Sequence, residues 1–186
     1  MDNVLNLTTQ EARTLSFQCE FYARMRMGQF AELPFHYLDI RALGGSLFCE
    51  KREQAETLLF KARKYILPGL GAPGHSYGIG RFDDADLAFD IHQVIRRFFG
   101  DSRNPFSYHT LPRAWRTIAD GEEAILLKLE PEHIPILEKV KAFCESIDKG
   151  KYDVIADLFA DPQETTEEGR EEAKKILSQV KDIICG

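Results

Sequence analysis

The sequence has little of several features that mark specialised classes of protein. It holds four cysteines in 186 residues and no CxxC pair, so neither a disulfide framework nor a zinc-binding cysteine motif is indicated. Cys19, Cys49, Cys144 and Cys185 lie in apolar stretches with helical spacing. We therefore predict buried, reduced thiols in a reducing compartment.

Long apolar runs and an excess of positive charge are also missing. No segment approaches the roughly 18–20 apolar residues that span a bilayer, so we expect no membrane partner. The net charge of -6 argues against binding a nucleic-acid duplex, because neutralising its phosphates takes a basic face. The first residues, MDNVLNLTTQEA, lack the basic and apolar regions of a signal peptide, which favours a cytoplasmic location.

Known catalytic motifs are missing as well. The sequence contains no P-loop, HExxH or GxSxG. Gly69, Gly71 and Gly74 spell GxGxxG, but no strand is predicted before them and no helix directly after, as a dinucleotide site requires. The acidic residues fall at helix starts or on solvated faces, so no pair is marked for acid and base roles.

The histidines do not have the spacing of a metal site. His75, His92 and His109 could meet Asp83 or Asp90 at a metal only if the fold gathered them. We expect neither a metal nor a cofactor. A metal-dependent hydrolase stays an alternative, and it would carry detectable metal when purified.

Helical periodicity dominates what is present. The composition, 44% hydrophobic and 29% charged, is that of a soluble globular protein. Long amphipathic helices are predicted over residues 50–67 and 167–184, and Thr8 with Glu11 and Thr165 with Glu168 fit capping boxes. A strand is predicted over residues 4–7, and a hairpin, residues 116–118 and 124–129, that could share its sheet. The fold class is therefore mostly α with a minor β element.

An apolar pattern near the N-terminus returns later in the chain. Each residue of a first set has a similar residue 122 positions on: Leu5, Leu7, Leu15, Phe21, Met25, Gly28, Phe30 and Leu33 match Leu127, Leu129, Leu137, Phe143, Ile147, Gly150, Tyr152 and Ile155. This predicts a duplicated strand, helix, Gly-x-(Phe/Tyr), helix unit. The alternative is the general similarity of amphipathic helices. We predict a single domain over residues 1–186: a first repeat (1–67), an insert (68–113), and a hairpin with the second repeat (114–186).

The predicted insert begins with a glycine-rich loop. Gly69, Gly71, Gly74, Gly78 and Gly80 make an irregular connection, and long loops inside compact domains are frequently functional. A helix follows, capped by Asp83 or Asp84 and ended by Gly100. Its predicted core face is Leu87, Ala88, Ile91, Val94, Ile95 and Phe98, and its polar stripe is Asp86, Asp90, Gln93 and Arg97. The alternative is that Asp90 and the arginines are solvated or pair with neighbouring residues.

Basic, aromatic and polar residues gather in and around this insert. Arginines hold phosphates and aromatic rings stack on bases, whereas the acids at the helix start repel phosphate and suit ribose hydroxyls. We predict a ligand-binding site made of His75, Ser76, Tyr77, Arg81, Asp90, His92, Gln93, Arg96, Arg97, Arg103, Asn104 and Trp115. The absence of a catalytic constellation favours a binding protein over an enzyme.

Two segments carry a family resemblance. FYARMRMGQFAEL (residues 21–33) and SYGIGRFDDADLAFDIHQVIRRFFGDSRNP (residues 76–105) resemble a family of small hypothetical proteins of phages and prophages. In that family Y-x-R-x-x-x-G-Q-F is followed by a glycine-containing loop and an A-(F/Y)-D-(I/L)-x-Q-V-(I/L)-R helix. The resemblance implies roles for Tyr77, Asp90, Gln93 and Arg96. Arg97 stands where the family has His, which leaves open whether Arg96 or Arg97 faces a ligand.

The resemblance implies an anti-defence function. We expect a homo-oligomer in the cytoplasm of the infected bacterial host that sequesters a nucleotide signal, such as a cyclic nucleotide or an ADP-ribose derivative. One alternative is a protein-interaction module that inhibits a host enzyme. Another is a phosphodiesterase that cleaves the same ligand.

Overall fold

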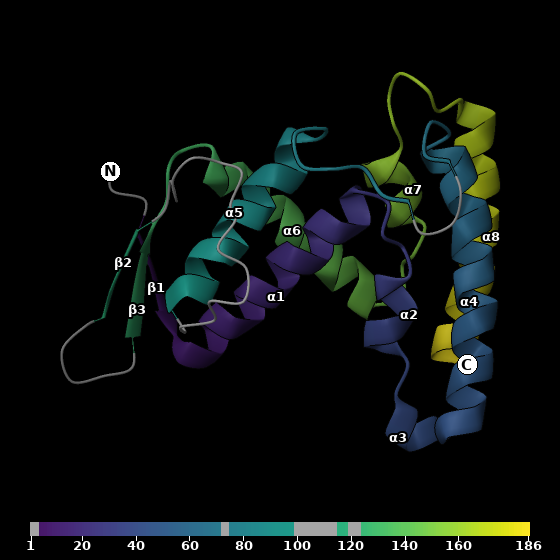
Figure 1. Ribbon diagram of the computed structural model, residues 1–186, viewed down its shortest axis with the longest axis horizontal. Coiled ribbons are helices and arrows are strands. Elements are labelled where there is room, and N and C mark those ends of the chain that lie inside the picture. Colours follow the sequence, from purple (N-terminus) through teal and green to yellow (C-terminus); the bar gives the residue numbers. More distant parts are fainter. Residues whose placement is uncertain (1–3, 72–74, 99–114, 119–123) are drawn as a thin grey trace. The chain divides into compact units, whose positions relative to one another are not determined.

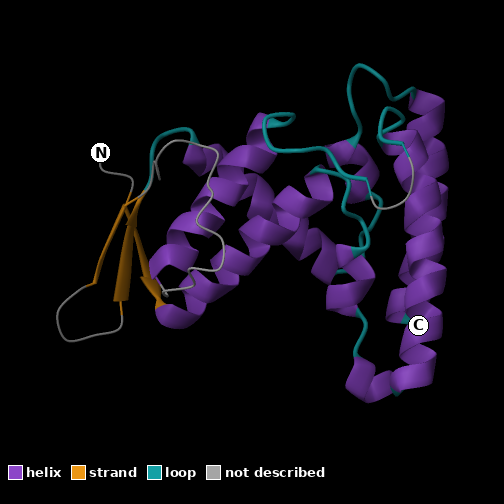
Figure 2. Cartoon of the chain, in the orientation of Figure 1, coloured by secondary structure: helices purple, strands orange, loops and turns teal. Residues whose placement is uncertain are grey.

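The computed structural model describes residues 4–71, 75–98, 115–118 and 124–186. The elements are β1 (Val4–Thr8), α1 (Thr9–Arg26), α2 (Glu32–Tyr37), α3 (Ile40–Leu43), α4 (Gly45–Ile66), α5 (Asp83–Phe98), β2 (Trp115–Ile118), β3 (Ala124–Lys128), α6 (His133–Asp148), α7 (Val154–Phe159) and α8 (Glu167–Cys185) (Figures 1 and 2). The protein is mostly α with a minor β element, as predicted. Within the described ranges no helix is both long and apolar enough to cross a bilayer.

The three strands form one small antiparallel sheet. Its order is β1-β3-β2, so the predicted hairpin and the N-terminal strand do share a sheet. The register places Leu5 opposite Leu127 and Ile118 opposite Ile125. The short strands keep the β element small, and helices make up most of the described residues.

The chain divides into two compact units. Unit 1 contains residues 1–23 and 79–144, and unit 2 contains residues 24–78 and 145–186. The divisions fall within α1, within α6 and in the loop before α5, whereas the predicted segment ends were residues 67 and 113. Each unit therefore combines residues from both predicted repeat copies.

Unit 1 has an aromatic and aliphatic core. The rings of Phe21 and Phe143 lie 5.7 Å apart, centroid to centroid, and Tyr22 meets Phe143 edge-on at the same separation. Four residues of the predicted apolar face of α5 are buried, Ala88, Ile91, Val94 and Ile95, while Leu87 is half-buried and the side chain of Phe98 lies outside the described residues. Burial of this apolar surface is the main force that holds unit 1 together.

Asp86, Asp90 and Gln93 of the polar stripe of α5 are buried too, so these three residues are not solvated, whereas the side chain of Arg97 lies outside the described residues. Asp90 is 6% exposed and Gln93 is 3% exposed. Asp86 accepts a hydrogen bond from the Gly80 backbone amide at 2.8 Å, and Asp84 accepts one from the Tyr22 hydroxyl at 2.8 Å. Buried polar groups need such partners, so these two acids fasten the start of α5 to its surroundings in unit 1.

Unit 2 is built on two long helices that run side by side, α4 and α8 (Figure 1). Each helix buries one stripe of residues at helical spacing: Ala55, Leu59, Ala62 and Ile66 on α4, and Ala173, Ile176, Leu177 and Val180 on α8. Both stripes were predicted from periodicity.

Of the two capping boxes predicted from the sequence, one is present in the structure. Thr8 and Glu11 form a reciprocal box: the Glu11 amide donates to the Thr8 hydroxyl, and the Thr8 amide donates to the Glu11 carboxylate. The second prediction is wrong by one residue. Thr166, not Thr165, caps α8 by accepting from the Gly169 amide at 3.0 Å, while the Thr165 hydroxyl donates to the Ile66 carbonyl.

Several element bounds keep the predicted offset of 122 residues. The helices α2 and α7 begin at Glu32 and Val154 and end at Tyr37 and Phe159, and α4 and α8 begin at Gly45 and Glu167. The duplication itself stays a prediction, and matching bounds are what it predicts.

Local hydrogen bonds repeat at the same offset. The Gly28 amide donates to the Met25 carbonyl at 3.0 Å, and the Gly150 amide donates to Ile147 at 2.9 Å. Both glycines have positive φ, 87° and 69°. The two helices, α1 and α6, therefore end in the same left-handed turn, a common C-terminal cap.

Replacing Gly28 with alanine tests this turn. A Cβ there would take a left-handed conformation and would meet the side chain of Leu70, so we expect Gly28→Ala to lower the free energy of unfolding by roughly 1–3 kcal/mol. Gly45 lies in α4, and a Cβ added to it would meet no described atom within 4 Å. Gly45→Ala should be neutral or stabilising by up to about 1 kcal/mol. Equal effects of both substitutions in urea unfolding would contradict this role of Gly28.

Thiol labelling tests the burial of the cysteines. All four are thiols rather than disulfides, but Cys49 and Cys185 are exposed, which corrects the prediction that all four are buried. Burial raises the pKa of the Cys19 thiol, which suppresses the reactive thiolate. We expect Cys49 and Cys185 to react quickly with an alkylating agent in the native protein, and Cys19 and Cys144 only after unfolding. Peptide mass spectrometry would show the order of labelling.

Candidate functional site

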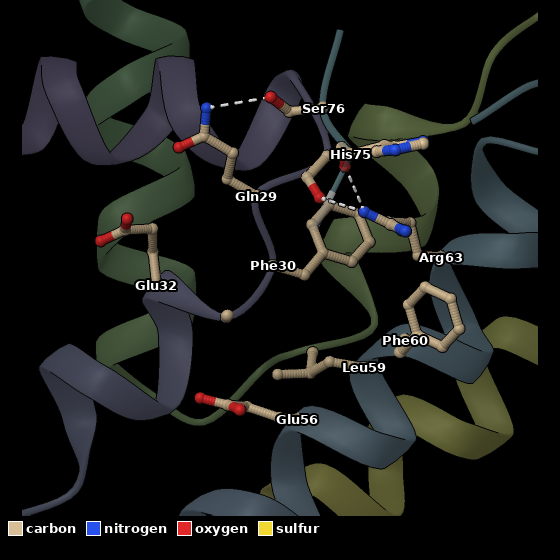
Figure 3. A pocket seen from close by; sticks show the side chains of 11 residues that line it. Gln29, Phe30, Glu32, Glu56, Leu59, Phe60, Arg63, His75 and Ser76 are labelled. Carbon is tan, nitrogen blue, oxygen red and sulfur yellow. Dashed lines mark hydrogen bonds between the residues drawn. The ribbon is translucent and has the colours of Figure 1, made fainter. Parts of the chain in front are cut away.

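A cavity of about 480 Å³ lies within unit 2 (Figure 3). Its walls come from the turn after α1, the start of α2, the middle of α4 and the loop after α4. We call it the first-repeat pocket. The side chains that give it chemical character are those of Gln29, Phe30, Glu32, Glu56, Phe60, Arg63, His75 and Ser76.

The turn at Gly28 creates one wall of this pocket. The positive φ of Gly28 lets the chain reverse after α1, so that the next residues face α4. A Cβ at this position would overlap the space of Leu67 and Leu70. Glycine is therefore required both by the backbone conformation and by the close approach of these leucines.

Arg63 fastens the loop after α4 to this turn. Its guanidinium group is buried, with 4% of the residue exposed. It donates to the backbone carbonyls of Gly28 at 3.2 Å and His75 at 2.6 Å, and to that of Gly71 at 3.3 Å. Burial lowers the pKa of Arg63, but an arginine starts so far above neutrality that it stays charged at pH 7.

Two carboxylates are among the lining groups of the pocket, Glu32 on α2 and Glu56 on α4 (Figure 3). Glu32 pairs with Arg24 at 3.2 Å and with His36 at 3.1 Å, and Glu56 pairs with Arg52 at 2.6 Å. These pairs are partly exposed and add little stability. They do orient the carboxylates, whose remaining lone pairs accept hydrogen bonds from hydroxyl or amino groups.

An amide and two aromatic rings complete the lining. Gln29 donates from its Nε2 to the Ser76 hydroxyl at 3.4 Å and accepts from Arg24 at 3.1 Å. The Phe60 ring centroid lies 4.7 Å from the central carbon of the Arg63 guanidinium, a cation-π distance. The Phe30 ring is buried. The pocket thus offers apolar ring surface beside a small number of directional polar groups, as small-molecule sites do.

The structure brings two of the predicted site residues into this pocket, His75 and Ser76. Tyr77 also lies in unit 2, where its backbone amide donates to the Met27 carbonyl and its hydroxyl approaches Gly69. Arg103 and Asn104 lie outside the described residues, as do the side chains of Arg97 and Trp115.

The other predicted site residues belong to unit 1: Arg81, Asp90, His92, Gln93 and Arg96. Arg81 is exposed and lies over the Phe82 ring, at 5.8 Å. His92 is buried, with its Nδ1 3.0 Å from the Ser16 hydroxyl and its Nε2 3.7 Å from the Glu20 carboxylate. Such internal contacts of His92 belong to the core of unit 1.

The sequence prediction missed most of the pocket walls, namely Gln29, Glu32, Glu56, Phe60 and Arg63. One signal for Arg63 was present. Arg63 falls on the apolar stripe of α4 between Leu59 and Ile66, and a charged residue on a core face requires a specific partner. Glu32 and Glu56 gave no such signal, because they have the pattern of ordinary surface acids.

Comparison of the chain with protein-family models, curated proteins and solved structures gives no match to any of them. Among the residues that the structure describes, histidine, cysteine and acidic side chains do not gather in threes as a metal site requires. The chemistry of the pocket itself therefore carries the functional inference.

Removing the Arg63 guanidinium tests its role in holding the pocket. Arg63→Met leaves the buried carbonyl of Gly28 and the carbonyls of Gly71 and His75 without their charged donor, so we expect a loss of about 2 kcal/mol in the free energy of unfolding. We also expect faster proteolysis of the loop after α4. Lys61→Met, an exposed change on the same helix, is the control and should have little effect. An Arg63→Met variant as stable as the control would show that these hydrogen bonds contribute little.

Proposed function

We propose that this protein binds a small nucleotide-type molecule in the first-repeat pocket and retains it chemically unchanged. The observation that supports this most is the combination of aromatic surface with two oriented carboxylates in one cavity. Its volume, about 480 Å³, falls in the range of roughly 300–1,000 Å³ that small-molecule sites occupy.

The aromatic wall of the pocket fits the base of a nucleotide, and the carboxylates fit its ribose. A flat base packs on the part of the half-buried Phe60 ring that Arg63 and Lys64 leave open, where stacking is worth about 1–3 kcal/mol per base. Glu32 and Glu56 accept hydrogen bonds from ribose hydroxyls or from an exocyclic amino group. The amide of Gln29 has both a donor and an acceptor, and so suits the edge of a base.

The phosphates of such a ligand belong on the other side of the pocket. Glu32 and Glu56 repel phosphate, while the charge of Arg63 and the side chains of His75 and Ser76 favour it. Arg63 contributes mainly through its charge, because its hydrogen bonds go to backbone carbonyls. The ligand is thereby oriented with its sugar toward α2 and its phosphates toward the glycine-rich loop.

The polar side chains of the pocket favour retention of the ligand over its chemical conversion, because they are engaged by other side chains of the protein. Glu32, Glu56 and Ser76 each contact a neighbouring side chain that fixes the wall. General acid–base catalysis needs a group aimed at the proton it transfers, and these groups are oriented by their protein partners.

Both stretches that resemble the phage and prophage family contribute to the pocket, through Gly28–Glu32 and Ser76. In the proposed role the protein withdraws a nucleotide immune signal, a cyclic nucleotide or an ADP-ribose derivative, in the cytoplasm of the infected host. Light scattering of the purified protein would test the homo-oligomer that belongs to the same proposal.

A second candidate function is a protein-interaction module that inhibits a host enzyme. It is favoured by three large apolar side chains that are exposed along consecutive helices of unit 2. Phe35 is 55% exposed, Ile40 54% and Leu47 43%. Large apolar side chains exposed on successive helices are what a protein-binding surface would use.

A thermal-shift panel of cyclic nucleotides and ADP-ribose derivatives tests the first function. A ligand at 100 times its Kd stabilises the folded state by about 2.7 kcal/mol, which for a chain of this size raises the thermal midpoint by roughly 5–10 °C. We expect the double variant Phe60→Leu with Glu56→Gln to lose most of the shift, because it loses both the ring and the carboxylate. Mass spectrometry of the ligand released by heating should show it intact.

Two variants and the chemical state of the released ligand separate the alternatives. Phe35→Ser should keep the ligand shift, and its loss of host-enzyme inhibition would instead support the interaction module. Arg96→Ala examines whether α5 takes part in binding. Recovery of a linearised product would make the protein a phosphodiesterase, and no shift with any nucleotide at millimolar concentration would refute the proposal.

A further inference from the structure

A second, smaller cavity lies in unit 2 at the start of α7. Its volume is about 280 Å³, and its lining includes Gly150, Lys151, Tyr152, Asp153, Ser178 and Lys181. We call it the second-repeat pocket. It shares no lining residue with the first-repeat pocket, so what it binds does not depend on the function proposed above.

The two cavities occupy matching positions in the two predicted repeat copies. Each of the six residues just named stands 122 positions after a lining residue of the first-repeat pocket: Gly28, Gln29, Phe30, Ala31, Glu56 and Leu59. The left-handed glycine turn is present in both. The same backbone framework therefore carries two sets of side chains.

The residues that differ between the two sets make the second-repeat pocket more positively charged than the first-repeat pocket. Lys151 stands where the first pocket has Gln29, Lys181 stands where it has Leu59, and Ser178 replaces the carboxylate of Glu56. Asp153, in place of Ala31, is the one change of opposite sign. At the matched positions the first-repeat pocket thus has the Glu56 carboxylate, and the second-repeat pocket has two ammonium groups, a hydroxyl and the Asp153 carboxylate.

The ammonium groups of Lys151 and Lys181 have no ion pair or side-chain hydrogen bond among the described residues. The stem of Lys181 lies against Gly150, with its Cε 3.4 Å from the position of a Cβ on that glycine. This contact holds the ammonium group close to the cavity. Two like charges on one small cavity repel each other, and a bound anion would relieve that repulsion.

Lys174 also lines the cavity, but its charge is already balanced. Its ammonium group lies 2.9 Å from Asp157 and 2.9 Å from Glu171. These ion pairs leave Lys151 and Lys181 as the cations that an incoming anion would meet first. Asp153 opposes them, so the expected affinity is modest.

We propose that the second-repeat pocket binds the phosphate group of a small molecule. Lys151 and Lys181 supply the charge and donate hydrogen bonds, and the Ser178 hydroxyl supplies a further donor. The Tyr152 ring forms an apolar wall, with its hydroxyl directed to the Cys185 sulfur at 3.8 Å. The cavity is too small for a dinucleotide in its entirety, which restricts it to inorganic phosphate or a small phosphate monoester.

Titration with inorganic phosphate, followed by amide chemical shifts at constant ionic strength, tests this site. We expect saturable shifts at Gly150 and Lys151, and at least tenfold weaker binding in the double variant Lys151→Ala with Lys181→Ala. Replacing both lysines with arginine should keep the binding. Lys175→Ala is the matched control, since Lys175 lies on α8, pairs with Glu172 and does not line the cavity. A parallel titration with glycerol phosphate separates inorganic phosphate from a monoester as the preferred ligand.

The substitution Asp153→Asn tests the same site through a gain in affinity, whereas the alanine variants test it through a loss. Removing the carboxylate should strengthen phosphate binding several-fold, which damage to the fold would not do. The pocket variant Phe60→Leu with Glu56→Gln should bind phosphate like the unmodified chain, so failure of the first proposal leaves this one testable. Equal shifts with chloride, equal weakening by Lys175→Ala, or unchanged affinity in the double alanine variant would each overturn the proposal.

Discussion

The buried guanidinium group of Arg63 is the interaction on which the described part of the candidate site depends. Three backbone carbonyls, from Gly28, Gly71 and His75, converge on it. The buried carbonyl of Gly28 requires a donor, and one planar cation with several N–H groups serves it together with the carbonyls of Gly71 and His75, which are less deeply buried. The turn after α1 and the loop after α4 are thereby held together, and the cavity between them has fixed walls. A lysine could not replace this geometry, because its ammonium group is a point charge with no planar fork.

Much of the fold could be predicted from local patterns. The helices follow from apolar spacing, the sheet from a hairpin signal, and one cap from the Thr8 and Glu11 pair. Such features depend on residues close together in the sequence, where spacing largely determines which groups meet. The cap of α8 was missed by one residue because Thr165 and Thr166 are adjacent hydroxyl residues. Their roles are decided by the Ile66 carbonyl, nearly a hundred positions away in the chain.

The candidate site was predicted only in part, for a physical reason. The glycine-rich composition drew attention to His75 and Ser76, which line the candidate cavity, since irregular loops expose their side chains. The polar residues of α5 show a limit of such predictions. Asp90 and Gln93 were predicted to face a ligand, with solvation or pairing with neighbours as the alternative, and both are buried; a polar residue type does not reveal whether its partner is water, ligand or protein. Glu32 and Glu56 look like ordinary surface acids, and only the turn at Gly28 brings them to a common cavity.

The pairing of β1 with β3 has a consequence for the origin of this chain. Antiparallel strands bring residues 122 positions apart face to face at one point, and here that point is Leu5 with Leu127. The ring contact of Phe21 with Phe143 has the same separation. Contacts between equivalent residues are the hallmark of a two-fold axis. Under the proposed duplication, the ancestor was a half-length polypeptide whose two identical subunits met at these leucines and phenylalanines, and gene fusion later allowed each half to acquire its own pocket.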